Sequence, residues 1–266
     1  MLNFICLGSG SSGNCYYLWT DEGGIMIDAG IGIRGIKKIF REYGLSFRLL
    51  NAIFVTHEHA DHIKAVGALS DDQNLPVYAT AKVHEGMMRN YCMTTKVKTE
   101  RCKILEKNTS IELAGFSITP FTVPHDSSDN VGYLIKTKGK TFCLITDAGS
   151  VTEEMKSYIK QADYLVIEAN YDGHMLAMGP YPPYLKVRIA SDSGHMCNTC
   201  TAQTLIENGF DKLKYVWLCH LSEENNHPEL ARKTVEAAIQ SQGLLVGKDI
   251  HLEVLKRKVP SGIYNL

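Results

Sequence analysis

The sequence predicts an α/β fold in which two β-sheets pack face to face between outer helices, a four-layer αββα sandwich. Short β-rich segments recur in both halves of the chain, with helical patterns between them. The 266 residues are 44% hydrophobic, enough to bury a sizeable core. Because no internal repeat or low-complexity linker divides the chain, we expect residues 1–266 to form a single domain.

The first half contains five runs rich in β-branched and aromatic residues. They predict strands at Asn3–Leu7, Cys15–Trp19, Ile25–Asp28, Ala52–Val55 and Val77–Ala79. Apolar residues at helical spacing predict helices at Ile33–Tyr43, Ile63–Leu69 and Lys82–Asn90.

The second half of the chain likewise alternates predicted strands with predicted helices. Strands are expected at Ile111–Leu113, Phe116–Val123, Val131–Thr137, Thr141–Ile145, Tyr164–Glu168 and Tyr215–Leu218. Helices are expected at Thr152–Ile159, Asn198–Glu207 and from Pro228 to about Gln240. A stretch bearing prolines and tyrosines, Met178–Tyr184, precedes the second of these helices.

Composition excludes several classes of protein. With 28 basic and 29 acidic residues the formal charge is -1, so there is no global basic field of the kind that coats nucleic acid. The N-terminus lacks the basic segment of a signal peptide, and no apolar run reaches the length of a membrane span. We therefore expect a cytoplasmic protein without a membrane partner, with its eight cysteines reduced and mostly buried.

The segment Thr56–His62 reads THEHADH and directly follows a predicted buried strand. Residues two apart point the same way in an extended backbone, so His57 and His59 can bind one ion while Asp61 and His62 face a second. Imidazole and carboxylate ligands suit Zn²⁺, with Mn²⁺ or Fe as alternatives. The competing interpretation, a helix N-terminus with ordinary surface histidines, gives no reason for three histidines in six positions.

Four ligands do not complete two metal sites, so the metal interpretation predicts further ligands at later strand ends. His125, Asp147 and His220 occupy such positions, and Glu168 ends another strand. Because strand ends can meet along one rim of the sheets, we expect these side chains to converge.

The order H-x-H-x-D-H, strand-end His, strand-end Asp and strand-end His resembles the metallo-β-lactamase fold of binuclear hydrolases along the whole chain. The resemblance implies two divalent metal ions, Zn or Mn. It implies His57, His59 and His125 on the first metal, Asp61, His62 and His220 on the second, and Asp147 bridging them.

Further motifs, VIEANYD, GHMCN and HLSEENN, resemble the YycJ/WalJ-like branch of this fold and, more distantly, RNase Z-type nucleases. That likeness implies a proton-handling pair formed by Glu168 and His195. Met196 and Cys197 depart from the branch pattern. The competing interpretations, which we favour less, are a loop-capping role for His195 and a helix-capping or salt-bridging role for Glu168.

The resulting hypothesis is a metal-dependent phosphodiesterase, a DNA or RNA exonuclease that leaves 5′-phosphate ends. A hydroxide shared by the metals attacks phosphorus, with Asp61, Glu168 and His195 as catalytic residues and His195 protonating the leaving alkoxide. The alternative is hydrolysis of a small ester, thioester or lactone, whose leaving group needs no proton. A non-catalytic protein with a vestigial site fits poorly with seven candidate ligands.

Substrate contacts are expected from two segments. Ser11, Ser12 and Asn14 belong to the loop GSGSSGN, which reads as a phosphate cradle or as a flexible hairpin. Lys186 and Arg188 alternate beside Tyr184, so they could contact backbone phosphates while the ring stacks on a base, or form a solvated face.

Two further features concern the motif around His195. Asn198, three residues after it, is the remaining candidate substrate contact. Cys197 and Cys200 form a CxxC, which without a second pair makes no Cys₄ zinc site, and we interpret it as incidental. The oligomeric state does not follow from the sequence.

Overall fold

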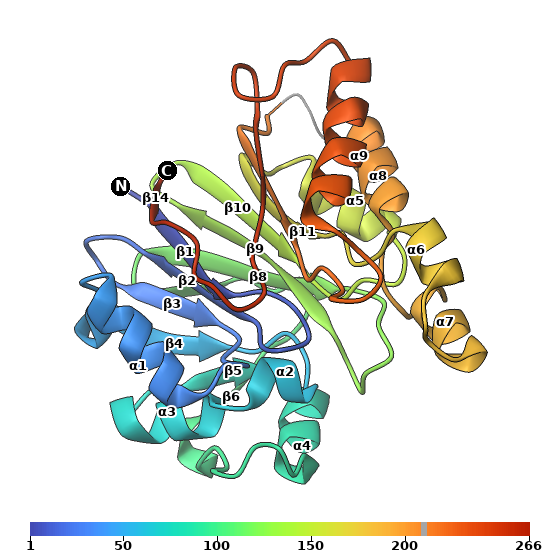
Figure 1. Cartoon of the computed structure of the whole chain (residues 1–266). Coiled ribbons are helices and arrows are strands. Elements are labelled where there is room, and N and C mark those ends of the chain that lie inside the picture. Colours follow the sequence, from blue (N-terminus) through green and yellow to red (C-terminus); the bar gives the residue numbers. More distant parts are fainter. Residues whose placement is uncertain (209–211) are drawn as a thin grey trace.

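Two mixed β-sheets form the centre of the computed structural model, which describes residues 1–208 and 212–266 (Figure 1). The first sheet has the order β14-β1-β2-β3-β4-β5-β6 and the second β13-β12-β11-β10-β9-β8-β7. The strands of the first sheet are β1 (Asn3–Gly8), β2 (Cys15–Trp19), β3 (Gly24–Ile27), β4 (Leu50–Phe54), β5 (Val77–Ala79), β6 (Cys102–Ile104) and β14 (Tyr264–Asn265). Those of the second are β7 (Ile111–Leu113), β8 (Phe116–Thr122), β9 (Val131–Thr137), β10 (Lys140–Ile145), β11 (Tyr164–Glu168), β12 (Tyr215–Cys219) and β13 (His251–Val254).

Helices cover the outer face of each sheet (Figure 1). Beside the first sheet lie α1 (Ile33–Glu42), α2 (Ala60–Ile63), α3 (Val66–Gln73) and α4 (Ala81–Arg89). Beside the second lie α5 (Glu153–Ile159), α8 (Asn198–Asn208) and α9 (Pro228–Ser241), and α6 (Gly173–Met178) and α7 (Pro183–Ile189) project from the same side. Short 3₁₀ turns at Phe47–Leu49 and Thr99–Arg101 precede β4 and β6.

Three buried apolar clusters define the four layers. Side chains alternate between the faces of a strand, so each strand can serve two clusters. On β4, Phe54 joins the cluster between the sheets, whereas Ile53 joins the cluster under α1, α3 and α4. On β12, Trp217 faces the first sheet while Leu218 packs under α5, α8 and α9. The predicted αββα sandwich is therefore confirmed.

Each sheet contains a run of parallel strands, β3 to β6 in the first and β10 to β13 in the second. Parallel strands bring their carboxyl ends to one edge of a sheet. Asp28, His57, Asp147 and His220 follow β3, β4, β10 and β12, and Glu168 ends β11. This topology is what places the predicted ligands on one rim.

Several elements differ from the sequence-based prediction. The helix expected at Ile63–Leu69 is two helices, α2 and α3, and Gly67 opens the second against the carbonyl of Thr95, which a Cβ would approach to 1.8 Å. The strands β6, β13 and β14 were not predicted. They lie at or next to sheet edges, and their two to four residues give little periodic signal.

The stretch after Met178 also forms a helix that was not predicted. The pattern Leu-Lys-Val-Arg-Ile alternates apolar and basic residues, as in a strand, yet Pro183–Ile189 is helical. Pro183 favours this outcome because the first turn of a helix needs no backbone N–H from that residue. Lys186 and Arg188 therefore do not share a face.

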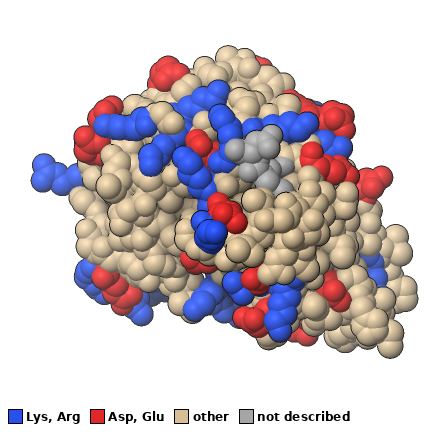
Figure 2. Space-filling view, turned by 90° about the horizontal axis from the view of Figure 1, so that it is seen from above, with Lys and Arg blue, Asp and Glu red and all other residues tan. Residues whose placement is uncertain are grey.

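Charged side chains are dispersed on the molecular surface. Figure 2 shows basic and acidic groups interspersed on one face of the molecule, most of which is uncharged. This distribution agrees with the near-neutral balance of the chain.

Candidate metal centre

The segment His57–His62 lies between β4 and α2. His59 caps α2 in an extended conformation, so Asp61 and His62 fall in the first helical turn. The carbonyl of Asp61 accepts a hydrogen bond from the backbone N–H of Asn14 at 2.7 Å. A Cβ on Gly30 would lie 1.6 Å from that same carbonyl oxygen, so only glycine permits the approach.

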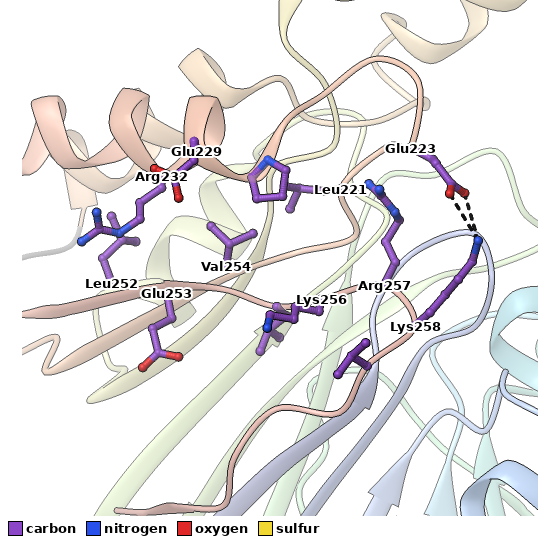
Figure 3. Close-up of a pocket in the computed structure, with 13 residues that line it drawn as sticks. Leu221, Glu223, Glu229, Arg232, Leu252, Glu253, Val254, Lys256, Arg257 and Lys258 are labelled. Atoms are coloured by element: carbon purple, nitrogen blue, oxygen red, sulfur yellow. Dashed lines mark hydrogen bonds and ion pairs between the residues drawn. The ribbon is translucent and has the colours of Figure 1, made fainter.

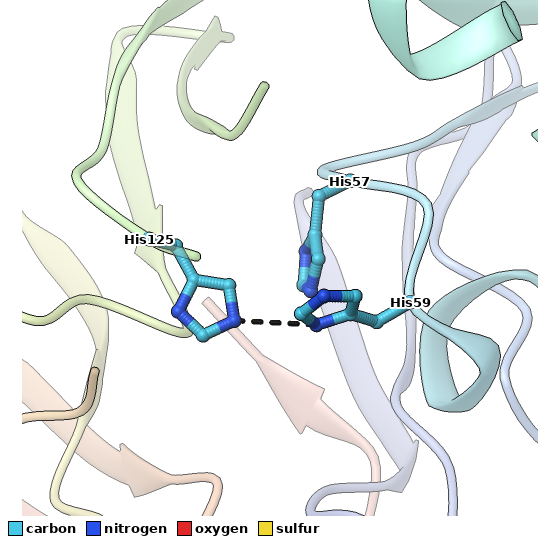
Figure 4. Close-up of side chains that lie close together, drawn as sticks. All are labelled: His57, His59 and His125. Carbon is cyan, nitrogen blue, oxygen red and sulfur yellow. Dashed lines mark hydrogen bonds between the residues drawn. The ribbon is translucent and has the colours of Figure 1, made fainter. Parts of the chain in front are cut away.

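We call His57, His59 and His125 the first cluster. One ring nitrogen from each lies within 4.8 Å of the other two, and the three rings converge in Figure 4. His125 donates from Nδ1 to the carbonyl of Gly194 at 3.0 Å, which leaves its Nε2 facing Nδ1 of His59 at 3.3 Å. Nε2 of His57 is buried without a hydrogen-bond partner in the described residues. An unpaired buried nitrogen aimed at two others fits a metal ion.

We call Asp61, His62 and His220 the second cluster, and their ligand atoms also lie within 4.8 Å of one another. Nε2 of His220 is 3.4 Å from Oδ2 of Asp61, and Nε2 of His62 is 3.5 Å from the same oxygen.

Asp147 lies between the two clusters. Its Oδ2 is 3.1 Å from Nε2 of His62, and its Oδ1 is 3.4 Å from Nδ1 of His220 and 3.8 Å from Nε2 of His125. The seven predicted ligands are therefore assembled in one place, with Asp147 in contact with both clusters.

Three strand-end residues of this region have left-handed backbone conformations. Asp28, Asp147 and His220 have φ of 58°, 53° and 53°. This conformation costs roughly 1–2 kcal/mol for a residue with a Cβ, so the surrounding structure must maintain it. Each of the three side chains joins the contacts of the centre.

Asp28 fixes the orientation of His62. Nδ1 of His62 lies 2.7 Å from Oδ2 of Asp28, and Thr56 donates to Asp28 from both its backbone N–H and its hydroxyl at 2.9 Å. With Nδ1–H donated to the carboxylate, Nε2 of His62 is free to act as a ligand. Asp28 is fully buried, and the prediction from sequence missed it.

The two clusters differ in their protonation. Burial lowers the pKa of His57 well below its ordinary value and also lowers that of His125. Burial acts in the same direction on His62 and His220, but nearby carboxylates, Asp147 foremost, outweigh it. They raise the pKa of His62 well above the ordinary value and that of His220 to about 10.

The carboxylates respond in the opposite sense. Burial favours the neutral form of Asp147, yet the charges of His220 and His62 hold its pKa well below the ordinary value. Asp61 behaves similarly, with His62 as the largest cause that lowers its pKa. The carboxylates of the second cluster therefore favour positive charge on the neighbouring imidazoles. Divalent cations can supply that positive charge in place of protons.

Glu168 links the centre to His195. Its Oε1 lies 2.8 Å from Nδ1 of His195 and 2.9 Å from Nδ1 of His220, while its Oε2 accepts backbone N–H bonds from Ala148 and Met196 at 3.0 Å. Glu168 is fully buried, whereas the side chain of His195 is 20% exposed. Burial lowers the pKa of His195, but Glu168 more than compensates and the pKa is raised.

The loop Gly8–Asn14 reaches the centre through Ser9 and Asn14, whereas Ser11 and Ser12, which the structure also describes, form no hydrogen bond with it. Ser11 and Ser12 are exposed, but Asn14 is fully buried. Nδ2 of Asn14 lies 3.2 Å from Oδ2 of Asp61 and 2.9 Å from Nε2 of His62. Ser9 accepts the backbone N–H of His220 at 2.9 Å. Asn14 is thus buried against two candidate ligands, and its role as a substrate contact stays a prediction.

Asn198 is likewise buried. It is 1% exposed, and its side-chain amide forms two hydrogen bonds of 2.9 Å with the amide of Asn226. Asn226 in turn donates to the carbonyls of Ala169 and Asn170. The side chain of Asn198 therefore joins two buried loops, and its role as a substrate contact stays a prediction.

Lys186 and Arg188 lie on helix α7 and point to different partners, and their contact with phosphates stays a prediction. On α7, Nζ of Lys186 donates to the carbonyl of Ala177 at 2.7 Å, whereas Nε of Arg188 binds Asp126 at 2.5 Å. Tyr184 is 75% exposed on the same helix and is free to contact a ligand.

Asp126 is a further residue that the sequence did not single out. Its Oδ1 is buried without a hydrogen-bond partner in the described residues and lies 3.4 Å from Nε2 of His125. Its Oδ2 is held by Arg188. In the sequence, the position of Asp126 directly after the candidate ligand His125 could have identified it.

A separate pocket of about 520 Å³ lies between the start of α9, β13 and the segment 255–259 (Figure 3). Leu221, next to His220, is part of its wall. Lys258 forms an ion pair with Glu223 at 3.2 Å, and Arg257 donates to the carbonyl of Ser222 at 2.9 Å. Arg232 and Lys256 are the other basic side chains of its described lining, and none of the seven candidate metal ligands lines this pocket.

In the part of the chain that the structure describes, no helix is long and apolar enough to cross a membrane.

Comparisons with known proteins agree with this geometry. The family model described as "Beta-lactamase superfamily domain" matches residues 24–214. Exodeoxyribonuclease YycJ of Bacillus anthracis is 36% identical over 262 residues, which cover 98% of each chain. Exodeoxyribonuclease WalJ of Streptococcus pneumoniae is 36% identical over 91% of this chain and 90% of its own. The crystal structure of the metallo-β-lactamase fold protein YhfI from Bacillus subtilis superposes with a TM-score of 0.73 at 16% identity, covering both chains completely.

Proposed function

The chain belongs to the β-lactamase superfamily, within the family of the YycJ and WalJ exodeoxyribonucleases, and we propose that it is a metal-dependent exodeoxyribonuclease. The observation that carries the proposal is the contact between Glu168 and His195 at the edge of the seven assembled ligands. A proton donor beside a metal centre suits the cleavage of a bond whose leaving group is a strong base.

We assign one metal ion to each of the two clusters. His57, His59 and His125 would hold one cation, and Asp61, His62 and His220 a second, with Asp147 serving both. Nitrogen and carboxylate donors suit Zn²⁺ or Mn²⁺. Such cations, when bound, polarise a phosphodiester and lower the pKa of a water molecule.

The protein's own groups complete the chemistry. Glu168 keeps a proton on Nδ1 of His195 and raises the pKa of the imidazole, so the ring can be protonated at neutral pH. Nε2 of His195 then donates a proton to the departing 3′-oxygen, which leaves a 5′-phosphate on the product. The buried Oε2 of Glu168, fixed by two backbone N–H groups, prevents the carboxylate from rotating away.

The relatives act on DNA, as their names state, and this favours DNA over RNA as the substrate. We include residues 1–266 as one hydrolase domain in the proposal. A cytoplasmic location is also part of it, supported by the burial of four of the eight cysteines in the core.

The test separates proton donation from metal binding. We expect His195→Ala to lower kcat on ordinary DNA by about 10²–10⁴-fold, the usual contribution of a general acid. DNA with sulfur in place of the 3′-bridging oxygen has a leaving group that needs no proton, so its cleavage should fall by less than about tenfold. The rates are measured in single-turnover reactions on 5′-labelled strands.

His174→Ala is the matched control, because His174 is an exposed histidine on α6 outside both clusters. It should leave both rates unchanged, and all three proteins should bind the same amount of metal. Equal losses on the oxygen and sulfur substrates would remove His195 from the role of acid. If the unaltered protein cleaves no DNA, an unaffected rate of His195→Ala on its true substrate would favour a bond with a readily departing group, such as an ester.

A further inference from the structure

The two cysteines of the CxxC motif lie in contact at the start of α8. Cys197 precedes the helix and Cys200 is in its first turn, and their Sγ atoms are 2.6 Å apart. A disulfide requires about 2.05 Å between sulfur atoms and Cα atoms within roughly 7 Å. The pair is therefore arranged so that a small movement of the side chains suffices to join them.

The pair is also accessible, unlike half of the chain's cysteines. Cys200 is exposed and Cys197 partly exposed, whereas Cys6, Cys15, Cys143 and Cys219 are buried. Burial raises the pKa of each of those four thiols. Thiols of that kind are inert, because the thiolate is the reactive form.

The surroundings of Cys197 favour its thiolate. Its Sγ accepts the backbone N–H of Cys200 at 3.2 Å and lies 3.1 Å from the hydroxyl of Thr199. The side-chain contact with Cys200 is the largest cause that lowers the pKa of Cys197, which falls to about 5, and it raises the pKa of Cys200. Cys197 is thus the attacking sulfur and Cys200 the resolving one.

We propose that Cys197 and Cys200 are a redox-active dithiol whose substrates are low-molecular-weight disulfides. The geometry suits thiol–disulfide exchange, because two accessible sulfur atoms lie in contact. The sulfur of Cys197 is also positioned by a backbone N–H at the N-terminus of the eleven-residue helix α8. This site is separate from the metal centre and does not depend on the proposed nuclease activity.

The exchange balances in two steps. The Cys197 thiolate attacks one sulfur of a small disulfide RSSR, forming a mixed disulfide and releasing RS⁻. Cys200 then loses its proton and attacks Sγ of Cys197, forming the intramolecular disulfide and releasing a second RS⁻. The two departing thiolates take up the two protons of the dithiol, so the protein is oxidised by two electrons and RSSR is reduced to two RSH.

The site is connected to the loop that holds His195. Cys197 follows His195 by two residues, and its backbone pairs with that of Tyr171. The hydroxyl of Thr201 donates to the carbonyl of Glu168 at 2.6 Å and lies 3.2 Å from that of Cys197. A bond between the sulfurs would therefore restrain the same turn that supports Glu168.

The experiment uses the reduced full-length protein equilibrated at pH 7 with mixtures of oxidised and reduced glutathione. Acid quenching and alkylation are followed by intact and peptide mass spectrometry. We expect a loss of two hydrogen masses located in a Cys197–Cys200 link, with a midpoint that follows a two-electron couple. Limiting iodoacetamide at pH 6 should alkylate Cys197 at least tenfold faster than Cys92, another partly exposed cysteine.

Variants separate the roles of the two sulfurs. Cys200→Ser should stop at one glutathionyl group on Cys197, and Cys197→Ser should react at least tenfold more slowly, while Cys92→Ser should behave like the unaltered chain. A dithiol that persists at every glutathione ratio, or an alkylation rate of Cys197 equal to that of Cys92, would overturn the proposal. The alkylation arm needs no variant, so a misfolded variant cannot decide the result.

Discussion

The two clusters of the metal centre differ in the charge state that their buried histidines favour. The first consists of imidazoles, and burial keeps His57 and His125 neutral. The second mixes imidazoles with carboxylates, and Asp147, Asp61 and Asp28 favour the charged form of His62. A cation can enter the first cluster without displacing protons, but in the second it must replace them. The difference teaches that one centre can combine a proton-independent site with a proton-linked one.

Asp61→Asn should have the largest effect, and it should affect the second cluster without affecting the first. The change removes a charged ligand from the second cluster alone, so we expect about one metal ion per chain instead of two and a loss of at least about 10³-fold in kcat on DNA. Metal is counted by plasma mass spectrometry after gel filtration. Asp72→Asn, an exposed aspartate outside the centre, is the control. Retention of two ions with full activity would show that Asp61 is no ligand.

The sequence predicted the seven candidate ligands because they lie in the segment after β4 or shortly after other strands, and the structure brings them together. The sequence could not identify Asp28 in the same way. A single aspartate after a strand resembles a turn residue, and only the fold shows that its carboxylate binds His62. The left-handed φ of 58° at Asp28 is likewise a property of the assembled structure.

The substrate contacts were harder to predict because they depend on exposure. Asn14 and Asn198 lie in polar, glycine-containing segments that look like surface loops, yet both are buried by hydrogen bonds to distant residues. The helix α7 was not predicted, although Pro183 at its first turn and the close packing of Gly194 against Arg188 are compatible with it. Local patterns do not contain these long-range contacts.

Asp28→Asn should have an intermediate effect that is confined to the second cluster. The amide preserves the shape of the carboxylate but removes the charge that fixes the Nδ1–H tautomer of His62. Loss of such a supporting contact typically weakens metal affinity by about 10–100-fold. Competition with a chromogenic chelator measures the affinity of each site. Equal weakening of both sites would show that the clusters are not independent.

The stability of the metal-free protein should depend on pH, and this effect should be the smallest of those predicted. The two clusters should lose their stabilising contributions at opposite ends of the pH range. The pKa of His220 is raised to about 10, so its contribution to stability is complete below the ordinary value near 6.5 and is lost as the pH rises through 10. The pKa of His57 is lowered, so its contribution is lost as the pH falls below about 6.5.

Calorimetry between pH 5 and 10 should therefore find maximal stability of the metal-free protein near pH 6.5, with the midpoint temperature lower by roughly 5 °C or more at each end. Metal removes the protons from the second cluster, so the alkaline loss should shrink in the metal-loaded protein. An alkaline loss of the same size with metal bound would contradict the proton-linked character of that cluster.

The most direct test of the nuclease proposal is digestion of end-labelled linear DNA and of covalently closed circular DNA by protein reconstituted with Zn²⁺ or Mn²⁺. Asp61→Asn, purified in parallel, controls for contaminating nucleases. We predict metal-dependent shortening of the linear DNA from its ends, with 5′-phosphate products, and no cleavage of the circles. Rapid cutting of closed circles would contradict the exonuclease assignment, and intact linear DNA in the presence of two bound metals would contradict the proposed function as a whole.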